Sequence, residues 1–211
     1  MIPSRDLLEA ARVLSLQPRI VEKDYVLGWL LDAIYAQPEL NETWVFKGGT
    51  CLKKCYFETY RFSEDLDFTI TDPGQIDESQ LRELFTKVCK WVYDRSGIET
   101  FPDRLRFEVY ADRRGSLSCE GRFHYRGPVS PRGDPPMIKL DLTSNELLAL
   151  EPVVRKVNHP YADRPLEGIH ARCYAFDEIF AEKIRALGER CRPRDLYDVI
   201  HLYRRDDRDR A

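Results

Sequence analysis

Apolar residues recur at helical spacing in three parts of the chain. The first part, residues 19–35, carries its apolar pattern at Ile20, Leu27, Leu30, Leu31 and Ile34. Pro38 then stops this pattern, a second amphipathic stretch covers 79–93, and the last part of the chain, 176–203, returns to the same period. A 3.6-residue period gathers apolar side chains on one face, so each part predicts helical structure with a buried face.

Other stretches favour β-strands, because apolar residues alternate with polar ones or β-formers cluster between turn residues. These stretches are 44–47, 65–70, 104–110, 117–125 and 137–143. Gly48 and Gly49 permit a tight turn after the first strand, and Thr50 is expected to cap a helix that continues to Tyr56. The pattern therefore predicts an α+β fold, a small mixed β-sheet flanked by helices with a helical C-terminal portion.

The composition excludes several classes of protein. With 211 residues and a net charge of −3, the chain has no global basic field, so any contact with nucleic acid must be local. Six cysteines without a Cys-x-x-Cys pair, together with only four histidines, argue against a zinc cluster. The amino terminus lacks the apolar core of a signal peptide, and no run is long enough to span a bilayer. We expect a cytoplasmic protein with reduced thiols and no membrane partner.

Asp65 and Asp67 alternate with the apolar residues Leu66 and Phe68. On a strand, both carboxylates would project from one face while the apolar side chains pack behind them. Two adjacent like charges repel, and such a pair suits Mg²⁺ or Mn²⁺ that carries the phosphates of a nucleotide. The glycine turn upstream favours this metal site over the alternative, a solvent-facing strand edge.

Lys183 falls inside the apolar arc of the predicted helix that begins at Phe176. Lysine is rarely buried without a partner, so its ammonium either extends to water or faces an anion, a triphosphate or a carboxylate. Pro193 suits the first turn of the next helix, where Asp195 borders the predicted buried stripe and Asp198 lies farther out. A role for Asp198 as a partner of the helix dipole stays open. The predicted stripe consists of Leu196, Val199, Ile200 and Tyr203.

A third carboxylate would complete a metal site with Asp65 and Asp67. Asp141 is the first candidate because it too lies in an alternating strand, and Glu108 is its competitor. If the Asp141 strand neighbours the Asp65 and Asp67 strand, three carboxylates can share two Mg²⁺ ions and align a hydroxyl with the α-phosphate. Basic residues between 183 and 194 form a local positive patch, suited to a phosphate backbone or to an ordinary charged surface.

Six short motifs follow one another from about residue 20 to residue 203. They are Glu22-Lys23-Asp24-Tyr25, Phe46-Lys47-Gly48-Gly49-Thr50, Arg61-Phe62-Ser63-Glu64-Asp65-Leu66-Asp67, Lys139-Leu140-Asp141, Ala181-Glu182-Lys183-Ile184-Arg185-Ala186-Leu187 and Pro193-Arg194-Asp195-Leu196-Tyr197-Asp198. In this order and spacing, the motifs resemble the nucleotidyltransferase toxins of the AbiEii/AbiGii family, within the DNA polymerase β-like nucleotidyltransferase superfamily.

The resemblance implies a nucleotidyltransferase-like core over 1–150, N-terminal helix included, and a helical region over 151–211 that packs on the core and completes the site. It implies that the glycine turn positions the nucleotide, that Asp65 and Asp67 bind metal, and that Lys183 and Asp195 are essential. It also implies a toxin of a toxin–antitoxin or phage-defence pair, with a cognate antitoxin as partner and RNA such as tRNA as acceptor. Many relatives continue into a larger helical region, so acceptor recognition here would be reduced, supplied by a partner or missing.

The leading hypothesis is a Mg²⁺-dependent nucleotidyltransferase that uses an NTP as substrate. The expected nucleotide-binding residues are Lys47, Gly48, Gly49, Thr50, Ser63 and Lys183, with Asp195 orienting the last of them. The expected catalytic residues are Asp65, Asp67, Asp141, Lys183 and Asp195, of which Asp65, Asp67 and Asp141 hold the metal. Two alternatives stay open: a module that binds a nucleotide or a partner without transfer, and a metal-dependent nuclease.

Overall fold

The computed structural model describes residues 1–58, 61–111, 115–144 and 146–204, and the chain divides into two compact units. The first unit comprises Met1–Leu147 and Val154–Cys173, and the second comprises Leu148–Val153 and Tyr174–Ala211. This division differs from the expected boundary near residue 150, because residues 154–173 return to the first unit as two strands. The charged end of the chain, for which the sequence suggests a solvated tail, lies outside the described residues from 205 onward.

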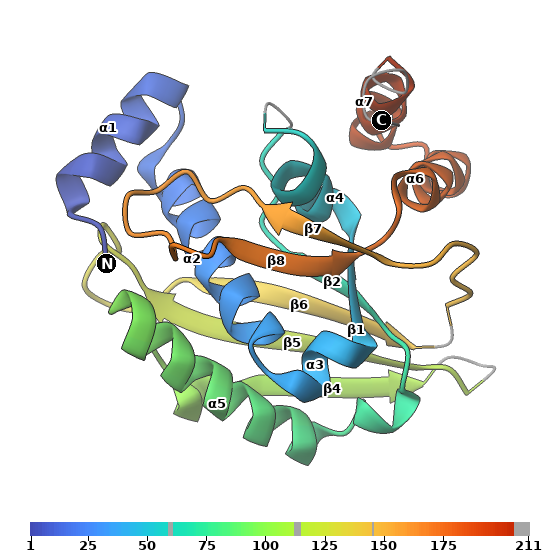
Figure 1. The fold of residues 1–211 in the computed structure, drawn as a ribbon, viewed down its shortest axis with the longest axis horizontal. Helices are drawn as coiled ribbons and strands as arrows, with labels where there is room; N and C mark the ends of the chain where they lie inside the picture. Colours follow the sequence, from blue (N-terminus) through green and yellow to red (C-terminus); the bar gives the residue numbers. More distant parts are fainter. Residues whose placement is uncertain (59–60, 112–114, 145, 205–211) are drawn as a thin grey trace. The chain divides into compact units, whose positions relative to one another are not determined.

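A mixed sheet of eight strands forms the centre of the first unit in its described part (Figure 1). The strand order is β3-β5-β6-β2-β1-β8-β7, and β4 also pairs with β5. Strand β1 is antiparallel to β2 and parallel to β8, while β2 is parallel to β6, which confirms the predicted mixed sheet. The strands are β1 Trp44–Lys47, β2 Leu66–Ile70, β3 Glu99–Thr100, β4 Arg106–Ala111, β5 Leu117–Arg126, β6 Met137–Ser144, β7 Val153–Val157 and β8 Ile169–Cys173.

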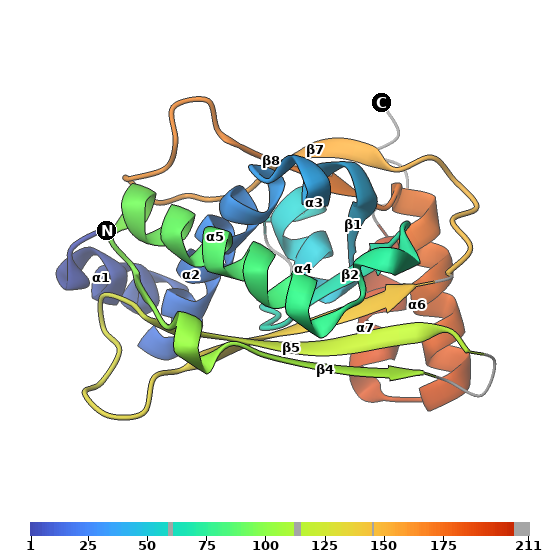
Figure 2. The same ribbon diagram turned by 90° about the horizontal axis from the view of Figure 1, so that it is seen from below.

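Helices α2 and α5 lie on the same side of the β4 and β5 part of the sheet, as Figure 2 shows. Helix α2 contacts β8 and α5, and α5 contacts β4. The helices of this unit are α1 Ser4–Leu14, α2 Pro18–Tyr35, α3 Pro38–Thr43, α4 Gly48–Cys51, the π-helix η1 Leu52–Tyr56, the 3₁₀ turns η2 Pro73–Gln75 and η3 Pro102–Arg104, and α5 Glu78–Ser96. None of the helices in the described part of the chain is long and apolar enough to cross a membrane.

The ends of α5 follow from its sequence. The Asp77 side chain accepts the Gln80 N–H at 2.9 Å, and Gly97, with φ +73°, ends the helix in a left-handed conformation. The core between α5 and the sheet is aromatic, because the Trp44 ring lies 5.0 Å from Phe68 and 5.8 Å from Phe85. This core supports β1 and β2, the strands that carry Lys47 and Asp67.

The second unit consists of helix α6 Phe176–Arg190, helix α7 Pro193–Tyr203 and the segment around residue 150. The two helices pack against each other. The buried residues of α7 are Asp195, Asp198 and Leu202, whereas Leu196, Ile200 and Tyr203 of the predicted stripe are exposed. The predicted buried face of this helix was therefore wrong, because α7 turns its acidic side toward a lysine of α6.

Several elements were absent from the prediction. Helices α1 and α3 and strands β3, β7 and β8 have no counterpart in the predicted pattern. Strand β8 buries Ile169, Ala171 and Cys173, which alternate with His170 and Arg172. The expected role of Thr50 as a helix cap was also wrong, because α4 begins at Gly48 and the residue lies inside the helix.

Candidate nucleotide and metal site

Three charged residues stand in register across neighbouring strands of the sheet. Asp67 of β2 pairs with Lys47 of β1 on one side and with Asp141 of β6 on the other. Directly paired residues project from the same face of a sheet, so the Asp67 and Asp141 side chains share a face. Glu108, the competitor for the third carboxylate, lies on β4, which pairs with β5 rather than with β2. The register therefore places Asp141, and not Glu108, beside Asp67.

The turn between β1 and α4 is shaped by Asp67. Gly48 has φ +76°, and a Cβ atom there would lie far inside van der Waals distance of Asp67 Oδ2. A Cβ atom on Gly49 would lie 3.1 Å from Ser63 Oγ. Gly48 is thus required by close approach, whereas a side chain at Gly49 would make Ser63 shift slightly. The structure brings Gly48, Gly49, Ser63 and Asp67 together at the start of α4.

Thr50 and Lys47 are engaged within the protein itself. The buried Thr50 hydroxyl donates to the backbone carbonyl of Asp65, which links the turn to the segment before β2. Because a hydroxyl has one proton, this bond leaves none for a phosphate oxygen. Lys47 Nζ donates to Thr143 Oγ1 at 3.1 Å and forms an ion pair with Glu146, an acidic residue that the sequence pattern did not single out. In this structure, both side chains hold the site together.

The carboxylates provide oxygen donors that suit a hard divalent cation. Partial burial raises the pKa of Asp65, repulsion from Asp141 adds to the effect, and Lys23 and Lys139 oppose it. A bound cation would relieve both of the unfavourable effects. However, the carboxylate oxygens of Asp65, Asp67 and Asp141 do not form a group within 4.8 Å in the described structure. Lys139 Nζ lies 3.1 Å from Asp141 Oδ1, so metal binding by all three would require this ion pair to open.

Lys139 and Asp141 are two residues apart on β6, so the same alternation that identified Asp141 also places the lysine on its face. The sequence thus carries a signal that Lys139 lies beside Asp141. Lys139 also contacts Glu120 of β5 at 3.1 Å, and Glu120 pairs with Asp141 in the sheet register. The row of charged residues that pair across β1, β2 and β6 therefore continues to Glu120 on β5.

In the second unit, Lys183 is buried and pairs with a carboxylate, one of the two arrangements expected for it. Its Nζ lies 3.1 Å from Asp198 Oδ2, and Asp198 is completely buried. Asp195 instead lies 3.2 Å from Arg190, while its Oδ2 atom is buried without a hydrogen-bond partner among the described residues. The expectation that Asp195 orients Lys183 was wrong, because Asp198 occupies that position.

A cationic pocket of about 290 Å³ lies elsewhere in the first unit. The cations and the histidine of its lining are Lys53 and Lys54 of η1, Lys156 of β7, and His159 and Arg164 from the segment between β7 and β8. Among the described residues, no carboxylate forms an ion pair with Lys156 or Arg164. Burial and the charges of Lys54 and Arg164 lower the pKa of His159 to about 3, so its imidazole is neutral. Sequence patterns missed this pocket because its two segments lie about one hundred positions apart.

The chain matches the sequence pattern of one protein family over residues 29–211, the nucleotidyl transferase AbiEii toxin family of type IV toxin–antitoxin systems. The chain belongs to the AbiEii family. This match covers every expected site residue and confirms the family that the motifs indicate. No curated protein matches the sequence.

The AbiEii chain is also similar to a solved structure, that of MenT4, a nucleotidyltransferase toxin from Mycobacterium tuberculosis H37Rv. The TM-score is 0.58 at 23% sequence identity, and the alignment covers 96% of this chain and 64% of MenT4. The chain thus spans somewhat less than two thirds of the length of MenT4. The likeness confirms the expected fold, a mixed sheet flanked by helices with further helices near the carboxy terminus.

Proposed function

We propose that this AbiEii family member is a Mg²⁺-dependent nucleotidyltransferase toxin that transfers a nucleotide from an NTP to an RNA acceptor such as tRNA. The observation that carries the proposal is the register of β2 and β6, which aligns Asp67 with Asp141. Asp67 also lies against Gly48, so the glycine turn adjoins this pair of carboxylates. A carboxylate pair next to a glycine turn is suited to hold a cation together with the phosphates of a nucleotide.

Each residue has a distinct part in this proposal. Bound Mg²⁺ would neutralise charge on the triphosphate and polarise the α-phosphate. Asp67, with Asp65, holds the cation beside the Gly48 turn. Once Lys139 moves away from its carboxylate, Asp141 assists these two at the cation or accepts the proton of the acceptor hydroxyl. Ser63, which lies against Gly49, contributes a hydroxyl near the phosphates.

The contribution of the second unit is proposed from the family motifs. Lys183 would neutralise charge on the triphosphate, and Asp198 would hold its ammonium in place. Asp195, with one buried oxygen lacking a partner among the described residues, is the second essential carboxylate in this region. We further propose that the protein acts in the cytoplasm, in a toxin–antitoxin or phage-defence pair, and that a cognate antitoxin restrains it.

Label transfer tests the proposal directly. The protein is incubated with total RNA and each α-labelled NTP in turn, with Mg²⁺, with Mn²⁺ or with a chelator. We expect RNA labelling that needs the cation and that falls at least about 100-fold in Asp67→Asn and Asp141→Asn. Asp94→Asn, on the exposed surface of α5, is the matched control and should label RNA at the wild-type rate. Equal labelling by wild type and Asp67→Asn would refute the proposal.

One observation favours a second candidate, a module that binds a nucleotide without transferring it. Lys139 already pairs with Asp141, and the three carboxylates are not gathered into one group. Calorimetry with each NTP and Mg²⁺ separates the two candidates, since the binding module gives heat of binding without labelled RNA. RNA shortened in the absence of NTP would instead indicate the nuclease alternative.

A further inference from the structure

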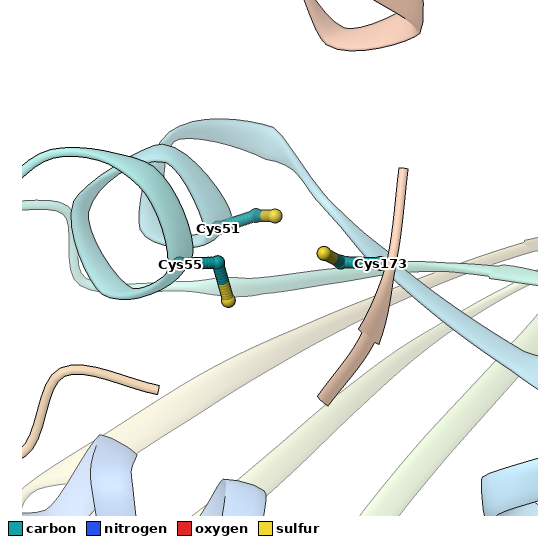
Figure 3. Close-up of side chains that lie close together, drawn as sticks. All are labelled: Cys51, Cys55 and Cys173. Atoms are coloured by element: carbon teal, nitrogen blue, oxygen red, sulfur yellow. The ribbon is translucent and has the colours of Figure 1, made fainter. Parts of the chain in front are cut away.

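Three cysteine side chains meet in the interior of the first unit. The Sγ atoms of Cys51, Cys55 and Cys173 all lie within 4.8 Å of one another. Cys51 and Cys173 are completely buried, and Cys55 is 6% exposed. Figure 3 shows the first two cysteines on successive turns of one helical segment, with Cys173 facing them from a strand. This grouping has no part in the proposed transfer reaction.

The backbone places these cysteines together. Cys51 ends α4, and Cys55 follows four residues later in the π-helix η1, so both side chains lie on one face of a continuous helical segment. Cys173 ends β8 and pairs with Phe46 of β1, the strand that leads directly into α4. The sheet thus sets the distance between the strand cysteine and the helical pair. Cysteine spacing does not reveal this group, because Cys173 lies far from the other two cysteines along the chain.

A phenol and a guanidinium lie beside the cluster. Cys173 Sγ lies 4.0 Å from the Tyr56 hydroxyl. Arg155 lies close by, because its Nε donates to the Cys55 carbonyl at 3.0 Å and its guanidinium lies over the Tyr56 ring at 4.3 Å. A positive charge at this place stabilises negative charge on the sulfurs.

We propose that Cys51, Cys55 and Cys173 bind one Zn²⁺ ion as three thiolates. Three S–H bonds break and three Zn–S bonds form, and the three protons pass to solvent without any change in oxidation state. The three thiolates and Zn²⁺ carry a net charge of −1, which the guanidinium of Arg155 balances. The Tyr56 hydroxyl is the candidate fourth ligand. Zn–S bonds of about 2.3 Å place tetrahedral sulfurs about 3.8 Å apart, so the sulfurs need to approach by about 1 Å at most.

This site would fasten the glycine turn to the sheet. Cys51 directly follows Thr50, so a metal bound to Cys51 and Cys173 links the helical segment after the turn to β8. The ion is structural in this proposal and takes no part in the transfer of a nucleotide. Cysteine spacing in the sequence argues against a zinc cluster. In this proposal Cys173, more than one hundred residues after the other two cysteines, completes one.

Metal analysis of the full chain tests the site independently of catalysis. The protein is purified from zinc-supplemented cells under reducing conditions, desalted and assayed for zinc by elemental analysis. We expect about one zinc per chain in the wild type and in Cys89→Ala and Cys119→Ala, which change buried cysteines outside the cluster. Cys173→Ala should lose the zinc. Equal zinc content in the wild type and Cys173→Ala, or no zinc in either, overturns the proposal.

A second measurement needs only the wild type, since a cluster variant can fail to fold. Removal of zinc with a chelator should lower Tm by about 10 °C, and returning Zn²⁺, but not Mg²⁺, should restore it. Replacement by Co²⁺ should produce the near-ultraviolet absorption of sulfur-to-metal charge transfer. An unchanged Tm together with the absence of that absorption overturns the proposal. Mass spectrometry of protein purified under reducing conditions gives a further check, since a disulfide within the cluster would also overturn it.

Discussion

Gly48 shows how one residue couples the backbone of the site to its chemistry. Its left-handed conformation disfavours any side chain, and the Asp67 carboxylate occupies the space that a Cβ atom would need. Two independent constraints therefore act at this position. Gly115 has a similar φ, +81°, but an added Cβ atom would contact nothing within 4 Å. A comparison of substitutions at Gly48 and Gly115 therefore separates the cost of backbone strain from the cost of collision with Asp67.

We expect Gly48→Ala to destabilise the protein by more than the roughly 1–3 kcal/mol of backbone strain, because the collision with Asp67 adds to it. Gly115→Ala should cost only the strain itself, about 1 kcal/mol. Urea denaturation of the two variants measures both changes, and RNA labelling should fall only in Gly48→Ala. Equal destabilisation by the two substitutions would show that Asp67 does not occupy this space.

At the scale of elements, a buried ion pair explains how α6 and α7 face each other. Lys183 and Asp198 are both buried and lie 3.1 Å apart, and the apolar side of α7 is exposed. A buried lysine without a counter-charge is costly, so pairing outweighs burial of the apolar stripe. Hydrophobic periodicity alone therefore predicted the wrong face of α7.

Lys183→Met should destabilise the protein by about 3–5 kcal/mol, because the buried Asp198 carboxylate would lose the ammonium that balances its charge. The double variant Lys183→Met with Asp198→Leu should recover most of this loss, since both charges are then removed together. Urea denaturation of the two single variants and the double variant gives the coupling energy. Lys87→Met, which breaks an exposed pair with Glu83 on α5, should cost no more than about 0.5 kcal/mol. Additive effects at Lys183 and Asp198 would contradict the buried pair.

At the scale of the whole molecule, positive charge is concentrated locally. The net charge is −3, yet the pocket between η1 and the β7–β8 segment gathers several cations. Lys54 is already paired with the buried Asp24 at 2.8 Å, whereas the described residues offer Lys156 and Arg164 no ion-pair partner. If the acceptor is RNA, these two cations are suited to contact its phosphates.

Lys156→Ala should weaken RNA binding and reduce the slope of log K against log salt by about 0.7–1, since one phosphate contact is lost. Fluorescence anisotropy with a labelled RNA at several salt concentrations measures both quantities. Lys87→Ala, a lysine on the exposed face of α5, is the matched control and should leave the slope unchanged. The same slope in both variants would exclude this pocket from the RNA-binding surface.

The sequence predicted much of the fold because most of its elements are regular. Helices α2, α5, α6 and α7 and strands β1, β2, β4, β5 and β6 all coincide with predicted stretches to within a few residues. Strands β7 and β8 did not coincide with any predicted stretch, although both are as long as β2. These two strands carry the chain back to the first unit after residue 153.

What the sequence by itself determined is local: the alternation around Asp67, the glycine turn and the order of motifs that marks the AbiEii family. Only the tertiary structure decided that Asp141 stands beside Asp67, that Asp198 rather than Asp195 holds Lys183, and that Cys173 joins the other two cysteines. The physical reason is that periodicity reports the face on which a side chain lies within its own element. Which distant element meets that face depends on strand order, register and the pairing of buried charge.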